Sequence, residues 1–155
     1  MNTEYNRRGY KIIGLDNPKS MHNVGSALRL AGCYDVHNVI ITGKRYKITS
    51  TDPSKNHKHL PLIQVDDLHD AVPFDCVPVA VDLVEGAVPL DQYEHPERAM
   101  YIFGQEDGTL GKRILSWCRD KVYIQTNGCL NLSHAIATVL YDRQVKRKEF
   151  YNAKV

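Results

Sequence analysis

Three short segments of this 155-residue chain place a glycine close to a guanidinium, a carboxylate or an amide side chain. A glycine lets another group approach the backbone closely. A guanidinium can stabilise a developing negative charge, and a carboxylate or an amide can orient it or bind a polar ligand. The segments are Asn23-Val24-Gly25-Ser26-Ala27-Leu28-Arg29, Phe103-Gly104-Gln105-Glu106-Asp107-Gly108 and Gly128-Cys129-Leu130-Asn131-Leu132-Ser133.

Each of these segments also has an ordinary structural explanation. Arg29 could form a surface ion pair, and Glu106 could stabilise the start of a helix through the helix dipole. Asn131 or Ser133 could simply be the N-cap of a helix. One segment alone is therefore weak evidence for a site, whereas three that each follow a strand favour one shared site.

The apolar pattern predicts the elements that position these segments. Short apolar runs without alternation are typical of strands buried on both faces, and they alternate with segments of helical periodicity. This alternation predicts an α/β domain with a mostly parallel sheet. The predicted strands are Lys11–Leu15, Val36–Ile41, Leu62–Val65, Val77–Leu83, Ala99–Phe103 and Val122–Ile124, and the predicted helices are Asn23–Cys33, Leu110–Cys118 and Leu132 to about Lys148.

The three polar segments are expected to meet at one edge of this sheet. A parallel α/β sheet binds its ligands at the carboxyl ends of its strands, and each segment follows a predicted strand. We expect Asn23 to cap the first helix and Arg29 to lie on the first turns of that helix. The polar stretch from Gly43 to His59 is predicted to be a loop.

The composition predicts a single domain spanning residues 1–155. No apolar run reaches the roughly 20 residues that a membrane helix needs, and the stretch from Met1 to Tyr10 lacks the apolar core of a signal peptide. We therefore expect a cytoplasmic protein that does not contact membranes. The four cysteines form no C-x-x-C pair, and His57 and His59 have no further ligand at zinc spacing, so we expect free thiols and no metal.

Basic residues gather in three places, although the formal net charge is only +2. Each cluster taken singly could be solvated surface. If the fold gathers them on one face, they would form a surface that binds nucleic-acid phosphates. The clusters are Arg7 and Arg8; Lys44, Arg45 and Lys47; and Arg143, Lys146, Arg147 and Lys148.

The three segments together resemble the motifs of the SpoU (TrmH-like) family of RNA ribose 2'-O-methyltransferases, in the SPOUT superfamily. The resemblance runs from about Tyr10 to Arg147. Two positions depart from the family pattern, because Cys129 stands in place of the usual Ser and Thr109 in place of a common Gly. A thiol is a weaker hydrogen-bond donor than a hydroxyl. The matching residues are Asn23, Gly25 and Arg29; Phe103, Gly104, Glu106 and Leu110; and Gly128, Leu130, Asn131 and Ser133.

The resemblance implies a SPOUT fold, which is a Rossmann-like sheet with a deep trefoil knot at its C-terminal end. General rules of topology disfavour threaded chains, so the knot is expected on the resemblance alone. The resemblance also implies S-adenosyl-L-methionine as cofactor, converted to S-adenosyl-L-homocysteine, with no metal. The cofactor is expected to be held largely by backbone groups, at Val81, Asp82, Gly104, Ile124, Cys129, Leu130 and Ser133.

The implied catalytic residues are Arg29, Glu106 and Asn131. A ribose hydroxyl is a poor nucleophile, so the enzyme must align it with the methyl group and favour loss of its proton. A guanidinium with a pKa above about 12 is a poor base, so we expect Arg29 to stabilise the developing alkoxide or to bind the adjacent phosphate. Glu106 and Asn131 would then orient Arg29. The implied RNA-binding residues are Asn23, Arg29, Lys44 and Arg45.

The resemblance implies a homodimer that packs through its first and last helices and acts on RNA. We expect tRNA ahead of rRNA, since small members of the family often modify tRNA. Two alternatives stay open. A nucleotide-binding oxidoreductase is disfavoured, because neither G-x-G-x-x-G nor a P-loop motif is present. A cofactor- and RNA-binding protein that has lost catalysis is suggested by Cys129.

Overall fold

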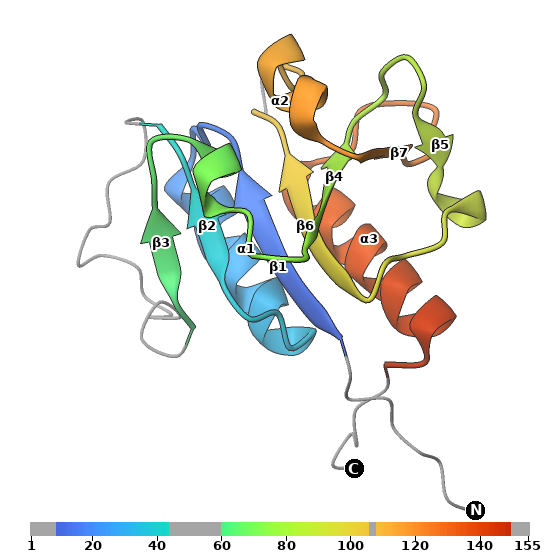
Figure 1. Cartoon of the computed structure of the whole chain (residues 1–155), viewed down its shortest axis with the longest axis horizontal. Coiled ribbons are helices and arrows are strands. Elements are labelled where there is room, and N and C mark those ends of the chain that lie inside the picture. The colour runs from blue at the N-terminus through green and yellow to red at the C-terminus, as the bar shows by residue number, and fades with distance from the viewer. Residues whose placement is uncertain (1–8, 44–59, 106–107, 150–155) are drawn as a thin grey trace, which may run out of the picture.

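The computed structural model describes residues 9–43, 60–105 and 108–149. These residues form a seven-stranded sheet in the order β3-β2-β1-β6-β4-β7-β5, and every strand pairing among them is parallel (Figure 1). The α/β class and the mostly parallel sheet are therefore confirmed, while the knot stays a prediction. The strands are β1 (Tyr10–Leu15), β2 (Val39–Ile41), β3 (Leu62–Gln64), β4 (Val77–Val81), β5 (Val88–Pro89), β6 (Arg98–Phe103) and β7 (Asp120–Tyr123).

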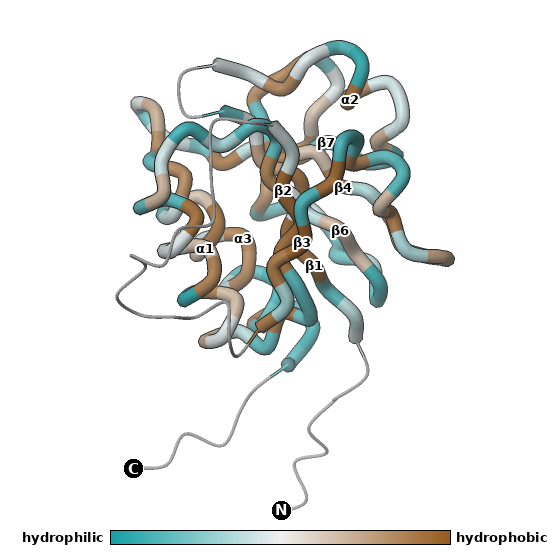
Figure 2. Tube along the Cα trace, turned by 90° about the vertical axis from the view of Figure 1, so that its left-hand side faces the viewer, coloured by the Kyte–Doolittle hydropathy of each residue, from teal (hydrophilic) through white to brown (hydrophobic). Residues whose placement is uncertain are grey.

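Three α-helices cover the two faces of the sheet. Figure 2 shows α1 and α3 side by side on one face, where their apolar residues join one core cluster with the strands. The second face packs against α2 and the short 3-10 helix η2. The helical elements are α1 (Met21–Cys33), η2 (Leu68–Ala71), η3 (Leu90–Gln92), α2 (Lys112–Trp117) and α3 (Leu132–Arg147). No helix in the described part of the chain is long and apolar enough to cross a membrane.

The start of α1 differs from the prediction. Ser20, rather than Asn23, is the N-cap, because its hydroxyl oxygen accepts hydrogen bonds from the backbone N–H groups of His22 and Asn23 at 3.1 and 3.4 Å. The helix therefore begins at Met21, two residues before the predicted start. Asn23 lies inside the first turn.

All seven strands end at the same side of the sheet, which we call the carboxyl edge. In the pairing register, Leu15 of β1 lies beside Phe103 of β6, Phe103 lies beside Val81 of β4, and Val81 lies beside Val122 of β7. These four strands are neighbours in the sheet even though they are far apart in the chain. The loops that follow these four strands therefore start side by side at the carboxyl edge.

Arg143, in the basic cluster at the end of α3, is not available to the phosphate-binding surface considered from the sequence, and the other two basic clusters lie outside the described residues. Arg143 is fully buried and donates to the carboxylate of Glu149 and to the carbonyl oxygens of Pro96 and Glu97. Its position explains this, because Arg143 lies seven residues after Ile136 on the apolar face of α3 that packs on the sheet.

Two neighbouring cations of the same cluster are also bound within the fold. Lys146 donates to the backbone carbonyl oxygens of Leu90 and Tyr93, and it pairs with Asp142 at 2.8 Å. Arg147 pairs with Glu149 at 3.1 Å. These side chains fasten the end of α3 to the loop that precedes β6, at the end of the sheet opposite the carboxyl edge.

Candidate functional site

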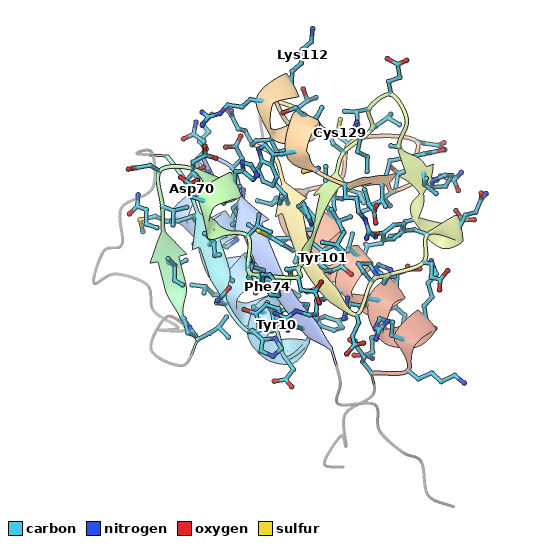
Figure 3. The ribbon with its side chains drawn as sticks, in the orientation of Figure 1. Tyr10, Asp70, Phe74, Tyr101, Lys112 and Cys129 are labelled. Carbon is cyan, nitrogen blue, oxygen red and sulfur yellow. The ribbon has the colours of Figure 1, made fainter. Side chains whose placement is uncertain are left out.

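Three loops come together at the carboxyl edge, after β4, β6 and β7. The strand order β6-β4-β7 makes these loops direct neighbours. They carry Asp82, Gly104 and the turn of residues 125–131. Figure 3 shows Cys129, from this turn, at the end of the sheet opposite to Tyr10. The edge therefore gathers all of the predicted cofactor positions, from Val81 at the end of β4 to Ser133 at the start of α3.

Asp82 connects the end of β4 to the loop after β6 and to strand β7 through hydrogen bonds. One carboxylate oxygen accepts the backbone N–H of Leu83 and the other accepts the backbone N–H of Leu110, both at 2.8 Å. The backbone N–H of Asp82 donates to the carbonyl oxygen of Val122 at 2.9 Å. Asp82 was expected to hold the cofactor through its backbone, and its carboxylate is engaged by two backbone amides of the fold.

Gly104 is packed tightly against the end of its own loop. A Cβ at this position would lie 3.2 Å from the backbone nitrogen of Leu110 and 3.4 Å from its Cγ. Leu110 is only 3 % exposed and belongs to the core between the sheet and α2. Glycine therefore permits the close approach of β6 and the start of α2. The predicted catalytic Glu106 lies in this loop but outside the described residues.

Asn131 is the N-cap of α3. Its side-chain oxygen accepts the backbone N–H of Ser133 at 2.9 Å and the hydroxyl of Ser133 at 2.8 Å. The structural role considered from the sequence is therefore real, and it occupies the amide oxygen. The two N–H donors of the Asn131 amide have no hydrogen-bond partner among the described residues, so they stay available to a ligand.

The turn before Asn131 offers unpaired backbone groups to a ligand. Within the described chain, no backbone–backbone hydrogen bond involves residues 125–130. Thr126 closes the turn, because its hydroxyl donates to the carbonyl oxygen of Gly128 at 2.6 Å. Cys129 is exposed, Leu130 is 39 % exposed, and the half-buried Ile124 packs on the core below them. Free backbone donors beside apolar side chains suit a cofactor held mainly by the backbone.

Arg29 lies further from the carboxyl edge than predicted. It is on the third turn of α1, about 12 Å along the helix axis from Met21 at 1.5 Å per residue. Its side chain is exposed and has no hydrogen bond or ion pair with any described residue. The structure therefore does not link Arg29 to Asn131. Space is open around the nearby Gly25, where an added Cβ would meet nothing within 4 Å.

A junction beside the site was not foreseen from the sequence. The hydroxyl of Thr42 accepts the backbone N–H of Asn17 at 3.0 Å and donates to Asp16 at 3.1 Å. Gly43 has a φ of +90°, and a Cβ there would lie 2.1 Å from the side-chain oxygen of Asn17. Only glycine fits this junction. The predicted RNA-binding residues Lys44 and Arg45 follow it but lie outside the described residues.

A groove of about 610 Å³ runs along the outer side of α3. Its lining includes Tyr34 after α1, Ile124 after β7, and Tyr141 and Val145 on α3. Tyr141 is 57 % exposed. Burial raises the pKa of Tyr34, and the nearby Cys33 and Tyr141 raise it further, so the phenol of Tyr34 stays neutral. The groove is lined by apolar and polar side chains of α3, together with Tyr34 after α1, the η3 segment and the end of β7.

The described side chains offer no metal centre. Within residues 9–43, 60–105 and 108–149, no three His, Cys, Asp or Glu side chains lie close enough together to hold a metal ion. Cys76 and Cys118 are buried, and burial raises the pKa of the Cys76 thiol to about 11 and that of Cys118 to about 12.

Comparison with known proteins matches most of the chain. The sequence model of the SpoU rRNA Methylase family matches residues 10–141. A curated relative, the 23S rRNA (guanosine-2'-O-)-methyltransferase RlmB of Acinetobacter baylyi, is 27 % identical over 143 residues. That match covers 84 % of this chain and 58 % of the relative, so the chain spans less than two thirds of the relative's length.

Two solved structures share the fold. The SpoU methyltransferase AviRb of Streptomyces viridochromogenes, in complex with AdoMet, superposes with a TM-score of 0.80 at 21 % identity, covering 92 % of this chain and 59 % of AviRb. A structure described as giving insights into the 2-OH methylation of C/U34 on tRNA superposes with a TM-score of 0.78 at 18 % identity. The superposition covers 91 % of this chain and 98 % of the chain in that structure.

Proposed function

Because this chain belongs to the SpoU rRNA methylase family, we propose that it methylates RNA at a ribose 2'-hydroxyl with S-adenosylmethionine as donor. The proposal rests on the strand pairing at the carboxyl edge, where Leu15, Phe103, Val81 and Val122 lie side by side. This pairing brings the loops after four neighbouring strands to one edge of the sheet. The sequence of the chain matches the family over residues 10–141. The products are 2'-O-methylated RNA and S-adenosylhomocysteine.

The turn of residues 125–130 is the part of the site that would hold the cofactor. Its backbone groups are unpaired within the described chain, and Ile124 and Leu130 provide apolar contact. Gly104 follows β6, which is separated from β7 by β4, at the same edge of the sheet. When bound, S-adenosylmethionine supplies a methyl group already activated by its sulfonium. The side chains of this chain therefore need only to align the ribose and to favour loss of its proton.

Arg29 would provide the positive charge that this reaction needs. Its guanidinium is exposed and unpaired among the described residues, so RNA can reach it. A guanidinium close to the ribose would stabilise the developing alkoxide or bind the adjacent phosphate, and the hydroxyl proton would pass to water or to that phosphate. Asn131 would use its two free N–H donors to orient the reacting groups, together with Glu106.

We place tRNA first as the substrate, with rRNA as the second candidate. The choice of tRNA is supported by the structure described for 2-OH methylation of C/U34 on tRNA, because this chain covers 98 % of that structure. The rRNA reading is favoured by the sequence relative RlmB, which acts on 23S rRNA. Arg143 of α3 is buried and bound within the fold, so it is not available to RNA.

We also propose that the protein works as a homodimer in which the groove beside α3 receives a second copy. The groove lies between the end of α1 and α3, which are the helices through which the family is expected to pack. Its exposed apolar side chains, Tyr141 and Val145, would be covered by the partner. Analytical ultracentrifugation of Tyr141→Asp tests this, and a variant that stays dimeric contradicts it.

Two measurements separate the proposed function from its alternatives. Titration calorimetry with S-adenosylhomocysteine and with NAD should show binding of the first and none of the second, and the reverse result would identify a dinucleotide enzyme. Transfer of tritium from labelled S-adenosylmethionine to total tRNA, and separately to ribosomal RNA, should label the tRNA. Label in rRNA alone would move the substrate to rRNA, and cofactor binding without label in either would indicate a protein without catalysis.

A further inference from the structure

Asp82 has a bonding pattern that direct cofactor binding does not require. Both oxygens of its carboxylate accept backbone amides at 2.8 Å, one from the next residue, Leu83, and one from Leu110 across two strand ends. Hydrogen bonds to a charged acceptor are stronger than those to a neutral one. The longer-range bond therefore fixes the end of the β6–α2 loop to the end of β4.

The loop held by this bond runs from Gly104 to Gly111. Its first residue follows β6, a turn joins the N–H of Gly108 to the carbonyl oxygen of Gln105 at 3.3 Å, and Leu110 is buried in the core. The N-cap of α2, Gly111, has no side chain to accept a hydrogen bond at this helix start. Asp82, on a neighbouring strand, binds the amide immediately before it.

We propose that Asp82 is a positioning residue, whose carboxylate holds Leu110 and the start of α2 against Gly104 and does not itself bind the cofactor. This inference rests on the proposed function. Leu110 packs against Gly104, which follows β6 at the carboxyl edge, and the family motif position Glu106 lies between these two residues in the chain. Loss of the Asp82–Leu110 bond should therefore weaken cofactor binding and turnover through the loop, although no atom that touches the cofactor has changed.

Asp82→Asn is the most informative substitution. An amide offers one carbonyl oxygen and places its NH₂ group against one of the two backbone N–H groups, so one bond is lost and one repulsion is added. Asp120→Asn is a matched control. Asp120 is also the acceptor for two side chains, Tyr93 at 2.7 Å and Arg119 at 3.0 Å, but it lies at the start of β7, far from the carboxyl edge.

Three readouts distinguish positioning from general stabilisation: amide hydrogen exchange, the Kd for S-adenosylhomocysteine, and kcat for methyl transfer. For Asp82→Asn we expect faster exchange at Leu110, a Kd raised about tenfold and a lower kcat, with the KM for RNA within about threefold of wild type. For Asp120→Asn we expect the Kd and kcat to stay within about twofold of wild type. An equal loss of cofactor affinity in both variants would overturn the inference.

Gly104→Ala gives a second test if Asp82→Asn does not fold. The added methyl would press on the backbone nitrogen of Leu110 from 3.2 Å and would displace it from an intact Asp82 carboxylate. We expect faster exchange at Leu110 and a raised Kd here as well, and an unchanged Kd with faster exchange overturns the inference. If the wild-type protein binds no S-adenosylhomocysteine, the proposed function fails; if it binds and the Asp82 and Gly104 variants bind equally well, only the positioning role fails.

Discussion

The guanidinium of Arg143 and the carboxylate of Glu149 form a two-point ion pair inside the fold. The Nε and Nη2 atoms of Arg143 donate to the two carboxylate oxygens at 3.1 and 2.9 Å, and Lys11 of β1 donates to the same carboxylate at 3.0 Å. Burial alone would raise the pKa of Glu149, but the hydrogen bonds and charges of Arg143 and Lys11 bring it below its usual value. Glu149 is therefore ionised at neutral pH.

Removing the charge of Glu149 should destabilise the protein strongly. Glu149→Gln leaves the fully buried Arg143 without its counter-ion, and breaking a buried pair in this way costs about 3–5 kcal/mol. We expect the free energy of unfolding in urea to fall by that amount. Glu97→Gln is the control, because the Glu97 side chain is exposed and its change should stay within about 0.5 kcal/mol. Equal stability of the two variants would contradict the assignment.

His95 makes stability depend on pH in a separate range. Its side chain is fully buried, with Nδ1 2.7 Å from the hydroxyl of Tyr101 and Nε2 2.7 Å from the carboxylate of Asp142. Burial lowers the pKa of His95 to about 4; Asp142 opposes this shift, and the charges of Arg143 and Lys146 reinforce it. At neutral pH the ring is uncharged, so its contact with Asp142 is a hydrogen bond and not an ion pair.

The unfolded chain should therefore take up a proton on His95 near pH 6.5, whereas the folded protein takes it up only near pH 4. Unfolding binds a proton between these values, so stability falls as the pH is lowered through this window, by about 3 kcal/mol in total. Urea unfolding between about pH 7.5 and about pH 5 measures this slope. His95→Gln should flatten it and the exposed His134→Gln should not; an unchanged slope in His95→Gln would exclude His95 as its origin.

One substitution can separate the capping role of Asn131 from its proposed role as a hydrogen-bond donor to the reacting groups. Asp at this position still accepts the N–H of Ser133 and caps α3, but it lacks the two N–H donors of the amide. We expect Asn131→Asp to keep its stability and to lose methyl transfer about 10²-fold, the usual effect of removing an oriented donor. Asn131→Ala should lose about 1 kcal/mol of stability in addition. Full activity in Asn131→Asp would show that Asn131 caps α3 but has no role as a donor in methyl transfer.

Arg29 should matter for methyl transfer and not for cofactor binding. Arg29→Ala removes the charge proposed to stabilise the alkoxide, so kcat should fall by about 10²–10³-fold. The Kd for S-adenosylhomocysteine should stay within about twofold, because Arg29 lies on α1 and not in the turn of residues 125–130. Arg119→Ala, at the opposite end of the sheet, is the control. Substantial turnover in Arg29→Ala would rule out the proposed role.

The sequence predicted the elements well where the apolar pattern was long. The buried run Ala99–Phe103 and the period of Leu132, Ile136 and Leu140 correspond to β6 and α3. Strand β5 was missed, because Val88–Pro89 is too short to show a pattern. The start of α1 was misplaced, since Ser20 and Asn23 are both good capping residues and only the folded geometry selects between them.

The sequence predicts which loops form the site, but it does not predict the contacts between these loops. Strand ends that precede polar loops point to the carboxyl edge, but the neighbours β6, β4 and β7 depend on long-range pairing that a single sequence does not reveal. The Asp82–Leu110 bond is a result of that pairing. The burial of Arg143 could have been predicted from the sequence, because its spacing from Ile136 and Leu140 places it on the buried face of α3.

The pairing of β1 with β6 also determines when the sheet can be completed during synthesis. The six residues of β1 pair along their whole length with β6, and all of residues 16–97 lie between the two strands. As the chain leaves the ribosome, β1 has no partner on this side until β6, the central strand of the sheet, has been made. Contacts of such high sequence separation slow folding, so one edge of β1 stays unpaired until β6 is synthesised, even though β2 can pair with the other edge earlier.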